Sequence, residues 1–423
     1  DGDIDEFIIR TGDDLGWLGY FIGRSEVLHA LHIYVLPEEK EQLVAFMRGI
    51  IQNQSIKELS IHTDLGDQGF ESIGYFLRNH NALTHLRFDD FHVDTDCVQN
   101  IAMALEQCRH NSLRSFELDN SNASAEGFAE IAATLRTQSQ LEKLHLKYNN
   151  IGRDGCVALG NTLSRWQSSN LKFLDLSSNN IDDLRLCALV EGMSNCSNLE
   201  KLFLSDNRSI TAAGLRSMSP LLQSESCSLQ RIALENINFG DDGAISLADG
   251  LRGNKSMRTL RFAPMQSGIS HVGWAAFSKL LCDTSSINNT YLSNHTIERI
   301  GYDTYCANPP DIEQYLAWNR DERSDAATAI CKILESHSDL DIKPFFQWKL
   351  KFLPVIINWF GRAQEAGLEQ SLGGRKLSSV YSFFPWYADV SWGSPKSRPR
   401  EDSSALTKTP IRWGDKMNIP LLR

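Results

Sequence analysis

Three stretches of the chain repeat one pattern of leucines. They are residues 141–155 (LEKLHLKYNNIGRDG), 171–181 (LKFLDLSSNNI) and 199–214 (LEKLFLSDNRSITAAG). Each fits L-x-x-L-x-L-x-x-N, and the alternating apolar residues predict a short strand with one face turned inward. The segment after each Asn has apolar residues at helical spacing. Each unit is therefore predicted to consist of a strand, a turn, a helix and a second turn.

Weaker copies of the pattern begin at seven further positions: Leu28, Ile56, Leu83, Leu113, Leu229, Met257 and Ile287. Counted from each of the ten starts to the next, the intervals are 28, 27, 30, 28, 30, 28, 30, 28 and 30. A single unit of this size cannot bury its own apolar face, so neighbouring units must share one core. The spacing predicts a parallel sheet with the helices outside it.

Units that alternate between these two lengths, with a full helix in each, resemble the ribonuclease-inhibitor class of leucine-rich repeats over roughly residues 25–300. The resemblance implies an α/β solenoid, or horseshoe, with parallel strands on the concave face and helices on the convex face. The flanking segments 16–23, 277–301 and 315–360 resemble those of a large group of uncharacterised algal leucine-rich-repeat proteins. Both resemblances concern architecture, because this repeat class serves many unrelated binding proteins.

The pattern divides the chain into four segments. Residues 1–27 contain an apolar, aromatic stretch and are predicted to form an N-terminal cap. Residues 28–300 hold about ten repeat units, each of roughly 30 residues. Residues 301–390 contain apolar helical stretches and are predicted to form a helical C-terminal cap. Residues 391–423 carry seven bases and three acids among many Ser and Pro residues, which predicts a disordered basic tail.

Three asparagines occupy the same slot in successive units: Asn149, Asn179 and Asn207. A buried Asn in register with its neighbours can bond to backbone groups of the adjoining turns that would otherwise have no partner. The sequence predicts that these residues form a structural Asn ladder and take no part in binding.

Charge and cysteine content narrow the class of protein. The chain has 42 Lys and Arg against 53 Asp and Glu, a formal charge of −11, which argues against nucleic acid or an anionic membrane as the main partner. Its nine cysteines show no paired spacing, so we expect free thiols, no metal and a cytoplasmic location, with the nucleus as the alternative. No apolar stretch is long enough for a membrane helix.

Catalytic motifs are absent from the sequence. There is no nucleophile elbow, phosphate-binding loop, dinucleotide fingerprint or zinc-protease motif, so we expect neither an enzyme nor a cofactor. The positions that remain are the strand residues that point away from the core. Phe173 and Phe203 fall in adjacent units with bases around them, and an acidic block of Asp89, Glu117 and Asp119 lies upstream.

Exposed aromatic residues flanked by charge are typical anchors of protein interfaces. We expect both Phe side chains to point to solvent on the concave face, although an exposed Phe on a broad sheet can also have no role. The predicted partner-binding residues are Phe173, Phe203, Lys143, His145, Lys147, Asp175, Lys201 and Arg231.

Two functions are compatible with this sequence. The first is a monomeric, non-enzymatic scaffold that holds another protein on its concave face. The second is a GTPase-activating protein, because Ran-GTPase-activating proteins use the same repeat class. Arg87 and Arg153 are the candidates for the catalytic Arg that such a protein needs. That family carries an acidic C-terminal tail, whereas this tail is basic.

Overall fold

The computed structural model describes most of the repeat region. The described residues are 13–34, 40–63, 66–89, 101–103, 105–106, 112–121, 125–165, 170–301, 308–321 and 324–337. The predicted basic tail and the predicted cap beyond residue 337 lie outside them.

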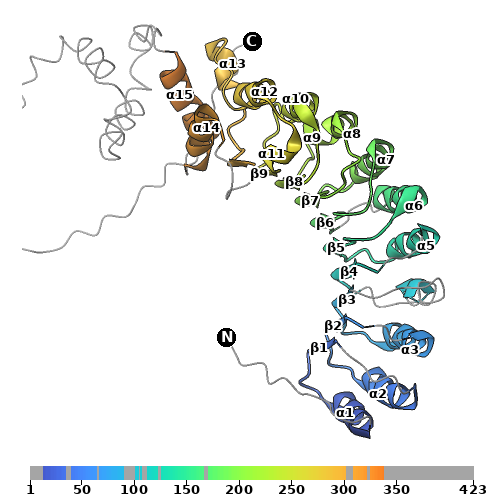
Figure 1. Ribbon diagram of the computed structural model, residues 1–423. Coiled ribbons are helices and arrows are strands. Elements are labelled where there is room, and N and C mark those ends of the chain that lie inside the picture. Colours follow the sequence, from blue (N-terminus) through green and yellow to red (C-terminus); the bar gives the residue numbers. More distant parts are fainter. Residues whose placement is uncertain are drawn as a thin grey trace, which may run out of the picture. The chain divides into compact units, whose positions relative to one another are not determined.

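Ten parallel strands form one open sheet in chain order within the described residues (Figure 1). The strands are β1 (Ala30–Ile33), β2 (Glu58–Ile61), β3 (His85–Asp89), β4 (Ser115–Asp119), β5 (Lys143–His145), β6 (Phe173–Asp175), β7 (Lys201–Phe203), β8 (Arg231–Ala233), β9 (Thr259–Arg261) and β10 (Arg299–Ile300). Each strand pairs with the strand of the next unit, so the repeat of the sequence becomes a repeat in space.

The helices of the units lie on the convex side, opposite the strands (Figure 1). In the repeats they are α2 (Lys40–Gln52), α3 (Gly66–Asn79), α5 (Ala125–Leu135), α6 (Gly152–Arg165), α7 (Asp183–Met193), α8 (Ala212–Ser217), α9 (Ser219–Gln223), α10 (Gly240–Gly250), α11 (Pro264–Ser267), α12 (His271–Leu281) and α13 (Ile287–Tyr291). At the ends are α1 (Asp13–Arg24), α14 (Pro310–Arg320) and α15 (Asp325–Ser336). This is the leucine-rich-repeat solenoid that the sequence predicts.

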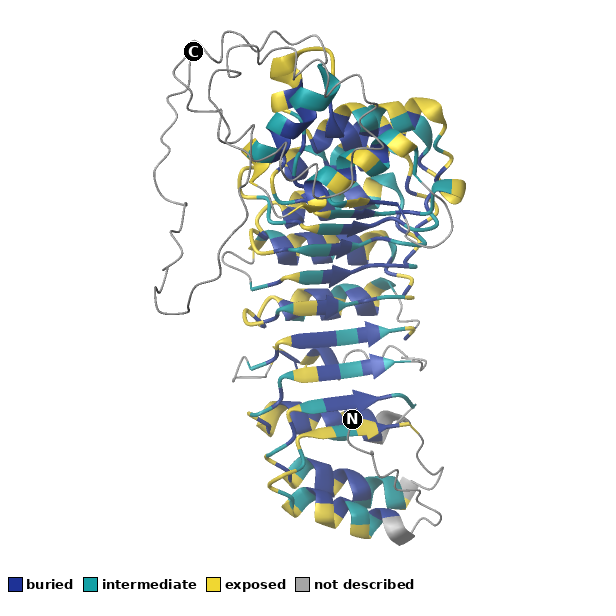
Figure 2. Ribbon diagram, turned by 90° about the vertical axis from the view of Figure 1, so that its left-hand side faces the viewer, coloured by how far each residue is buried: buried dark blue, intermediate teal, exposed yellow. Residues whose placement is uncertain are grey.

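The core lies between the sheet and the helices (Figure 2). Leu144, Leu174 and Leu202 pair in register on three adjacent strands, and none of them is exposed to solvent. Burying one leucine side chain stabilises a fold by about 1.5–3 kcal/mol, so the stacked leucines supply much of the stability. Because the core fixes every second strand residue inward, the residues between them must line the concave face.

The Asn ladder runs through the turns after three strands. Asn149, Asn179 and Asn207 are almost completely buried. The Asn149 backbone N–H donates to Asn179 Oδ1 (3.1 Å), and the Asn179 N–H donates to Asn207 Oδ1 (3.0 Å). Each side-chain amide also donates to a carbonyl oxygen of the preceding unit, at 2.6 to 2.9 Å. The three residues therefore tie successive turns together where the strand hydrogen bonds have ended.

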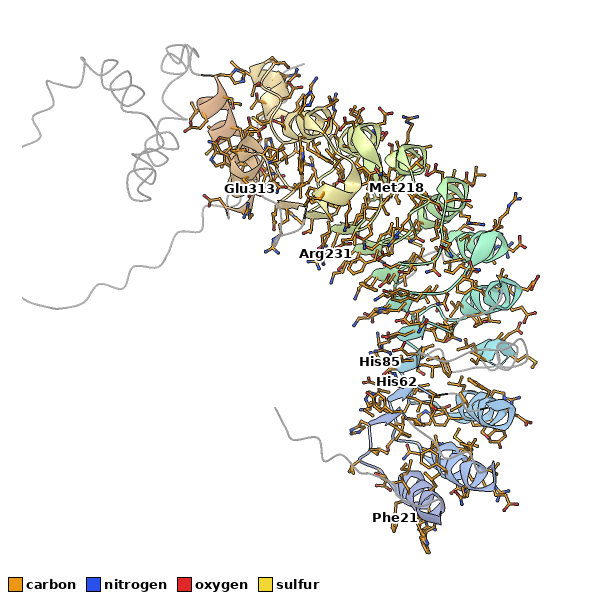
Figure 3. All side chains as sticks on the ribbon, in the orientation of Figure 1. Phe21, His62, His85, Met218, Arg231 and Glu313 are labelled. Atoms are coloured by element: carbon orange, nitrogen blue, oxygen red, sulfur yellow. The ribbon has the colours of Figure 1, made fainter. Side chains whose placement is uncertain are left out.

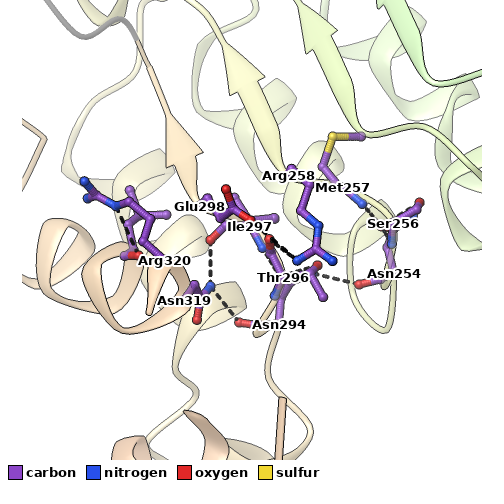
Figure 4. A network of polar contacts seen from close by, with 11 residues as sticks. Asn254, Ser256, Met257, Arg258, Asn294, Thr296, Ile297, Glu298, Asn319 and Arg320 are labelled. Carbon is purple, nitrogen blue, oxygen red and sulfur yellow. Dashed lines mark hydrogen bonds and ion pairs between the residues drawn. The ribbon is translucent and has the colours of Figure 1, made fainter. Parts of the chain in front are cut away.

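A second set of buried asparagines lies at the turn that leads into the strands. Asn254 and Asn294 each stand three residues before the start of a unit, and their amides donate to backbone carbonyls of the preceding unit (Figure 4). Asn319, on α14, continues this row by donating to Ile297 O at 2.7 Å. The row joins the first C-terminal cap helix to the last repeat.

The tenth unit does not begin where the spacing predicts, at Ile287. Residues 287–291 form helix α13 instead of a strand, and Ser286 caps the helix by accepting from the Asn289 N–H (3.1 Å). The strand β10 comes later, and its unit begins at Ile297, well beyond the expected start.

Burial explains this correction. Ile287 is 42% exposed, so it does not pack as the first leucine of a unit, whereas Ile297 and Ile300 are 0% and 3% exposed. Between Ile287 and Ile297, the side chains of Tyr291 and Leu292 are also exposed, so this segment does not contribute the apolar face of a strand. The regular spacing therefore ends at Met257, and an insertion precedes the last strand.

Helices α14 and α15 close the described end of the stack. Ile312 and Leu316 of α14 belong to the same core cluster as the repeats. Lys332 of α15 is completely buried, and its Nζ donates to Leu281 O (2.7 Å) and Asn294 O (3.0 Å). Burial lowers the pKa of Lys332 to about 7. Among the described helices, none has the length and apolar composition needed to cross a membrane.

Candidate functional site on the concave face

Two rows of side chains cross the middle of the concave face. Register places one residue of each strand beside its counterpart on the next strand. The amino-end row contains Ser115, Lys143, Phe173, Lys201 and Arg231. The carboxyl-end row contains Glu117, His145, Asp175, Phe203 and Ala233. These two rows hold all but one of the residues that the sequence predicts for partner binding.

Phe173 and Phe203 lie in different rows and are therefore diagonal neighbours. Their ring centroids are 5.0 Å apart, at an interplanar angle of 67°. Phe173 also stacks on the His145 ring, with centroids 4.5 Å apart. Both Phe residues are half-buried, so only part of each side chain on the concave face remains exposed to solvent. The register explains this, because the offset of one row lets each ring cover part of the other.

Three cations border this aromatic pair. Lys143, Lys201 and Arg231 lie in the amino-end row, and Figure 3 shows Arg231 on the strand side of the solenoid. Within the described residues none of the three has a carboxylate partner, whereas nearby Arg261 pairs with Glu235 at 2.9 Å. We name Lys143, Phe173, Lys201, Phe203 and Arg231 the Phe–cation patch. It combines apolar contact area with positive charge that no neighbouring acid neutralises.

Lys147 does not join this patch. It lies beyond the end of β5, and its Nζ sits over the Tyr148 ring, 4.7 Å from the ring centroid. Its ammonium group is thus held by an aromatic face of its own unit. The sequence places Lys147 two residues after His145 and so predicts both on the same face. No feature of the sequence predicts the contact between Lys147 and the Tyr148 ring.

His145 lies between two carboxylates of adjacent strands. Its Nε2 is 3.9 Å from Glu117 Oε1 of β4, and its register partner on β6 is Asp175. Burial is the main cause that lowers the pKa of His145, against the opposing effect of Glu117. Asp175 is buried and accepts from the Ser177 N–H at 2.9 Å.

The carboxyl ends of β3 and β4 carry the acidic block. Arg87 Nη2 donates to Asp89 Oδ2 (2.7 Å), and Arg87 Nε lies 3.6 Å from Glu117 Oε2. Asp119 is mostly shielded, and burial, followed by the neighbouring carboxylates of Glu117, Asp175 and Asp89, raises the pKa of Asp119 to about 6. The concave face is therefore basic at the amino-end row of β5 to β8 and acidic at the carboxyl ends of β3 and β4.

Two family models match parts of the chain. A model described as "Leucine Rich repeats (2 copies)" matches residues 169–217, and one described as "Leucine Rich repeat" matches residues 139–160. With the strand and helix order of the ten units, these matches identify the units as leucine-rich repeats, and their helix-containing form is similar to that of the ribonuclease-inhibitor type.

Several known proteins are similar to part of this chain. "NACHT, LRR and PYD domains-containing protein 5" of Mus musculus is 26% identical over 246 residues, which cover 57% of this chain and 20% of that protein. "Protein phosphatase 1 regulatory subunit 37 homolog" of Caenorhabditis elegans is 26% identical over 196 residues, which cover 46% and 20%. "Ribonuclease inhibitor" of Mus musculus is 25% identical over 215 residues, which cover 49% and 45%.

The chain thus spans about a fifth of the length of the first two relatives and less than half of the third. Among solved structures, "Crystal structure of Rad7 and Elc1 complex in yeast" aligns with a TM-score of 0.38 and 15% identity, over 63% of this chain and 74% of that chain.

Proposed function

We propose that the chain is a non-enzymatic protein-binding scaffold, and that its Phe–cation patch holds an acidic segment of a partner protein with an apolar anchor. The observation that carries the proposal is the half-buried pair of Phe173 and Phe203 beside three cations without carboxylate partners in the described residues. Aromatic residues at the centre of a patch with cations around them are typical of binding hot spots.

The rigid fold supports this proposal. Each patch residue lies on a strand whose backbone is fixed by core leucines and by both neighbouring strands. Little conformational entropy is lost when a partner binds to such a surface, so more of the contact energy contributes to affinity. Two relatives are named as an inhibitor of a ribonuclease and as a regulatory subunit of a phosphatase, and both names fit a role that acts on another protein.

The alternative, a GTPase-activating protein, finds less support. Arg87 pairs with Asp89 and lies 3.6 Å from Glu117, so it is not free to reach a bound nucleotide. Arg153 lies on α6, on the convex side. Accelerated GTP hydrolysis by any of a panel of small GTPases in the presence of the chain would contradict a purely non-enzymatic scaffold.

The test of the patch begins with a partner captured from a cell lysate and identified by mass spectrometry. Replacing both Phe173 and Phe203 by Ala should weaken its binding about 30-fold, equivalent to about 2 kcal/mol. The rings are half-buried, so we expect the same variant to lose about 1–2 kcal/mol of folding stability, measured by urea denaturation.

Charge variants separate the two parts of the patch. Replacing Lys143 and Lys201 by Glu should mainly slow association and reverse its dependence on salt. The matched control is Lys255→Glu, an exposed lysine in the turn before β9, which should leave the association rate nearly unchanged. Undiminished affinity of the double Ala variant would rule out the patch as the binding site.

A further inference from the structure

Three potential metal ligands of different chemistry converge beside the Phe–cation patch. Glu117 and Asp119 are two residues apart on β4, so both side chains lie on the concave face. His145 on β5 is the register partner of Glu117. One ligand atom from each of these three residues lies within 4.8 Å of the other two. All three residues lie on strands, so the spacing of two residues along β4 and the register between β4 and β5 are sufficient to bring them together.

The distance between the His145 and Glu117 ligand atoms is close to that between two ligands of a coordinated ion. Nitrogen and oxygen ligands lie about 2.0–2.2 Å from Zn²⁺, so two ligands of a tetrahedral ion are roughly 3.4 Å apart. Nε2 of His145 is 3.9 Å from Oε1 of Glu117. A side-chain rotation that moves Nε2 of His145 or Oε1 of Glu117 by less than about 1 Å would bring these two atoms to the spacing of two ligands on one ion.

The required ligand atoms are also available. Arg87 lies against Oε2 of Glu117, whereas Oε1 faces His145 and also accepts from the Ser115 hydroxyl at 3.2 Å, which leaves a second lone pair for an ion. Asp119 uses Oδ1 to accept from the Lys147 N–H (2.9 Å), and its other oxygen has no donor among the described residues. The Phe173 ring stacked on His145 restricts the imidazole to one orientation and shields one face of the site.

Charge in the surroundings favours a cation at this position. Four carboxylates lie close together here. Those of Glu117 and Asp175 act on His145, and those of Glu117, Asp175 and Asp89 act on Asp119. Arg87 is the cation in contact with two of them. The Nζ of Lys147 is turned to the Tyr148 ring, so Arg87 is the cation that acts on Asp119 in the described part of the chain, and it does so at longer range than on Asp89.

We propose that Glu117, Asp119 and His145 form a binding site for one divalent transition-metal ion. The set of one imidazole and two carboxylates favours Zn²⁺ over Ca²⁺ or Mg²⁺, which prefer oxygen ligands throughout. Three protein ligands leave the fourth position of a tetrahedral ion open toward the concave side. Metal binding at this site needs no partner protein, so it can be tested independently of the scaffold function.

The experiment is isothermal titration of the full chain, first freed of metal with a chelator, with Zn²⁺ alone. We expect one ion bound at this site, with affinity lowered at least tenfold by His145→Asn and by Glu117→Gln. Both residues line the surface, and circular dichroism checks that each variant is folded. His62→Asn is the matched control, because His62 pairs with the carboxylate of Asp89 at 3.5 Å and belongs to no group of three ligands among the residues that the structure describes.

Cobalt distinguishes this site from the cysteines of the chain. Co²⁺ bound by imidazole and carboxylates shows no thiolate charge-transfer absorption. The spectra of the parent and of the His145→Asn variant are compared at the same Co²⁺ concentration. We expect the absorption that the variant loses to contain no thiolate band. The proposal is overturned by three results: no saturable binding, equal binding to the parent and to the His145→Asn variant, or an equal loss of binding in the His62→Asn control. Saturable binding of Ca²⁺ but not Zn²⁺ at this position would equally overturn it.

Discussion

The slot three residues before each unit shows how much a single side chain decides. Asn53 and Asn254 fill it in two units, where the amide donates to the preceding unit and Oδ1 accepts from the backbone N–H three residues on. His80 fills the same slot before the third strand and is almost completely buried. Among the described residues, neither ring nitrogen of His80 has a hydrogen-bond partner. Burial lowers the pKa of His80 to about 4.

This slot predicts a pH dependence. A histidine whose pKa is near 6.5 unfolded and about 4 folded binds more protons in the unfolded state between these values. Stability is therefore lost as the pH falls from about 6.5 toward 4, by about 2 kcal/mol at pH 5. The His80→Asn variant, with an amide suited to the slot, should lack this loss. Urea denaturation of both proteins at pH 7.5 and pH 5 measures the difference, and parallel pH curves would contradict the assignment.

At the scale of elements, glycines set how closely adjacent helices pack. The backbone of α1 passes so close to α2 that a Cβ atom added to Gly49 would lie 1.7 Å from the Gly19 carbonyl oxygen. The same relation recurs between α6 and α7, where a Cβ on Gly192 would lie 2.2 Å from Gly160 O. Close approach of this kind requires glycine, because no rearrangement of a side chain can relieve a clash between two backbones.

The N-terminal helix provides the test of this packing. Replacing Gly49 by Ala should push α1 away from α2 and cost about 3 kcal/mol or more of stability. Gly16→Ala is the matched control, because its Cβ would lie 3.8 Å from Ala45 Cβ, an ordinary contact, and alanine favours a helix. Denaturation midpoints and hydrogen exchange of α1 distinguish the two variants. Equal stability of both would show that α1 can shift without penalty.

For the whole molecule, the ends of the stack matter most, because every inner unit is covered by two neighbours. The last strand, β10, is followed by α14, whose Ile312 and Leu316 belong to the repeat core. An exposed sheet edge with an open core associates with other chains. Loss of α14 would expose Ile297 and Ile300, which are buried. Ile287, which the regular spacing predicts at the apolar edge, is already exposed.

Deletion of residues 308–423 should therefore cause association and lower the melting temperature. The deletion uncovers Ile297 and Ile300 and removes both Asn319 and Lys332, which bond to backbone carbonyls of the last units. Light scattering and thermal melting measure the two effects. Deletion of residues 391–423 alone is the control and should leave stability unchanged within error. A monomeric longer deletion with the melting temperature of the parent would refute the role of α14 and α15.

The sequence alone determines the parts of this protein that depend on one unit and its copies. The leucine pattern predicts the strands, the helices, their parallel order and the solenoid, because an apolar face that recurs in every unit can be buried only by stacking. It also predicts which asparagines occupy one slot and which residues line the concave face. The regular spacing predicts a tenth unit at Ile287, which is wrong. An insertion lies there, and Ile287 falls at the expected interval without starting a strand.

Tertiary structure decides what depends on contacts between units. The half-burial of Phe173 and Phe203 follows from a diagonal offset between strands, and the cluster of Glu117, Asp119 and His145 follows from strand register. The removal of Lys147 from the patch follows from a local cation–π contact. Contacts between units join residues that lie one full repeat apart along the chain, so the repeat pattern fixes their slots. Their distances and burial depend on how each side chain packs against the next unit.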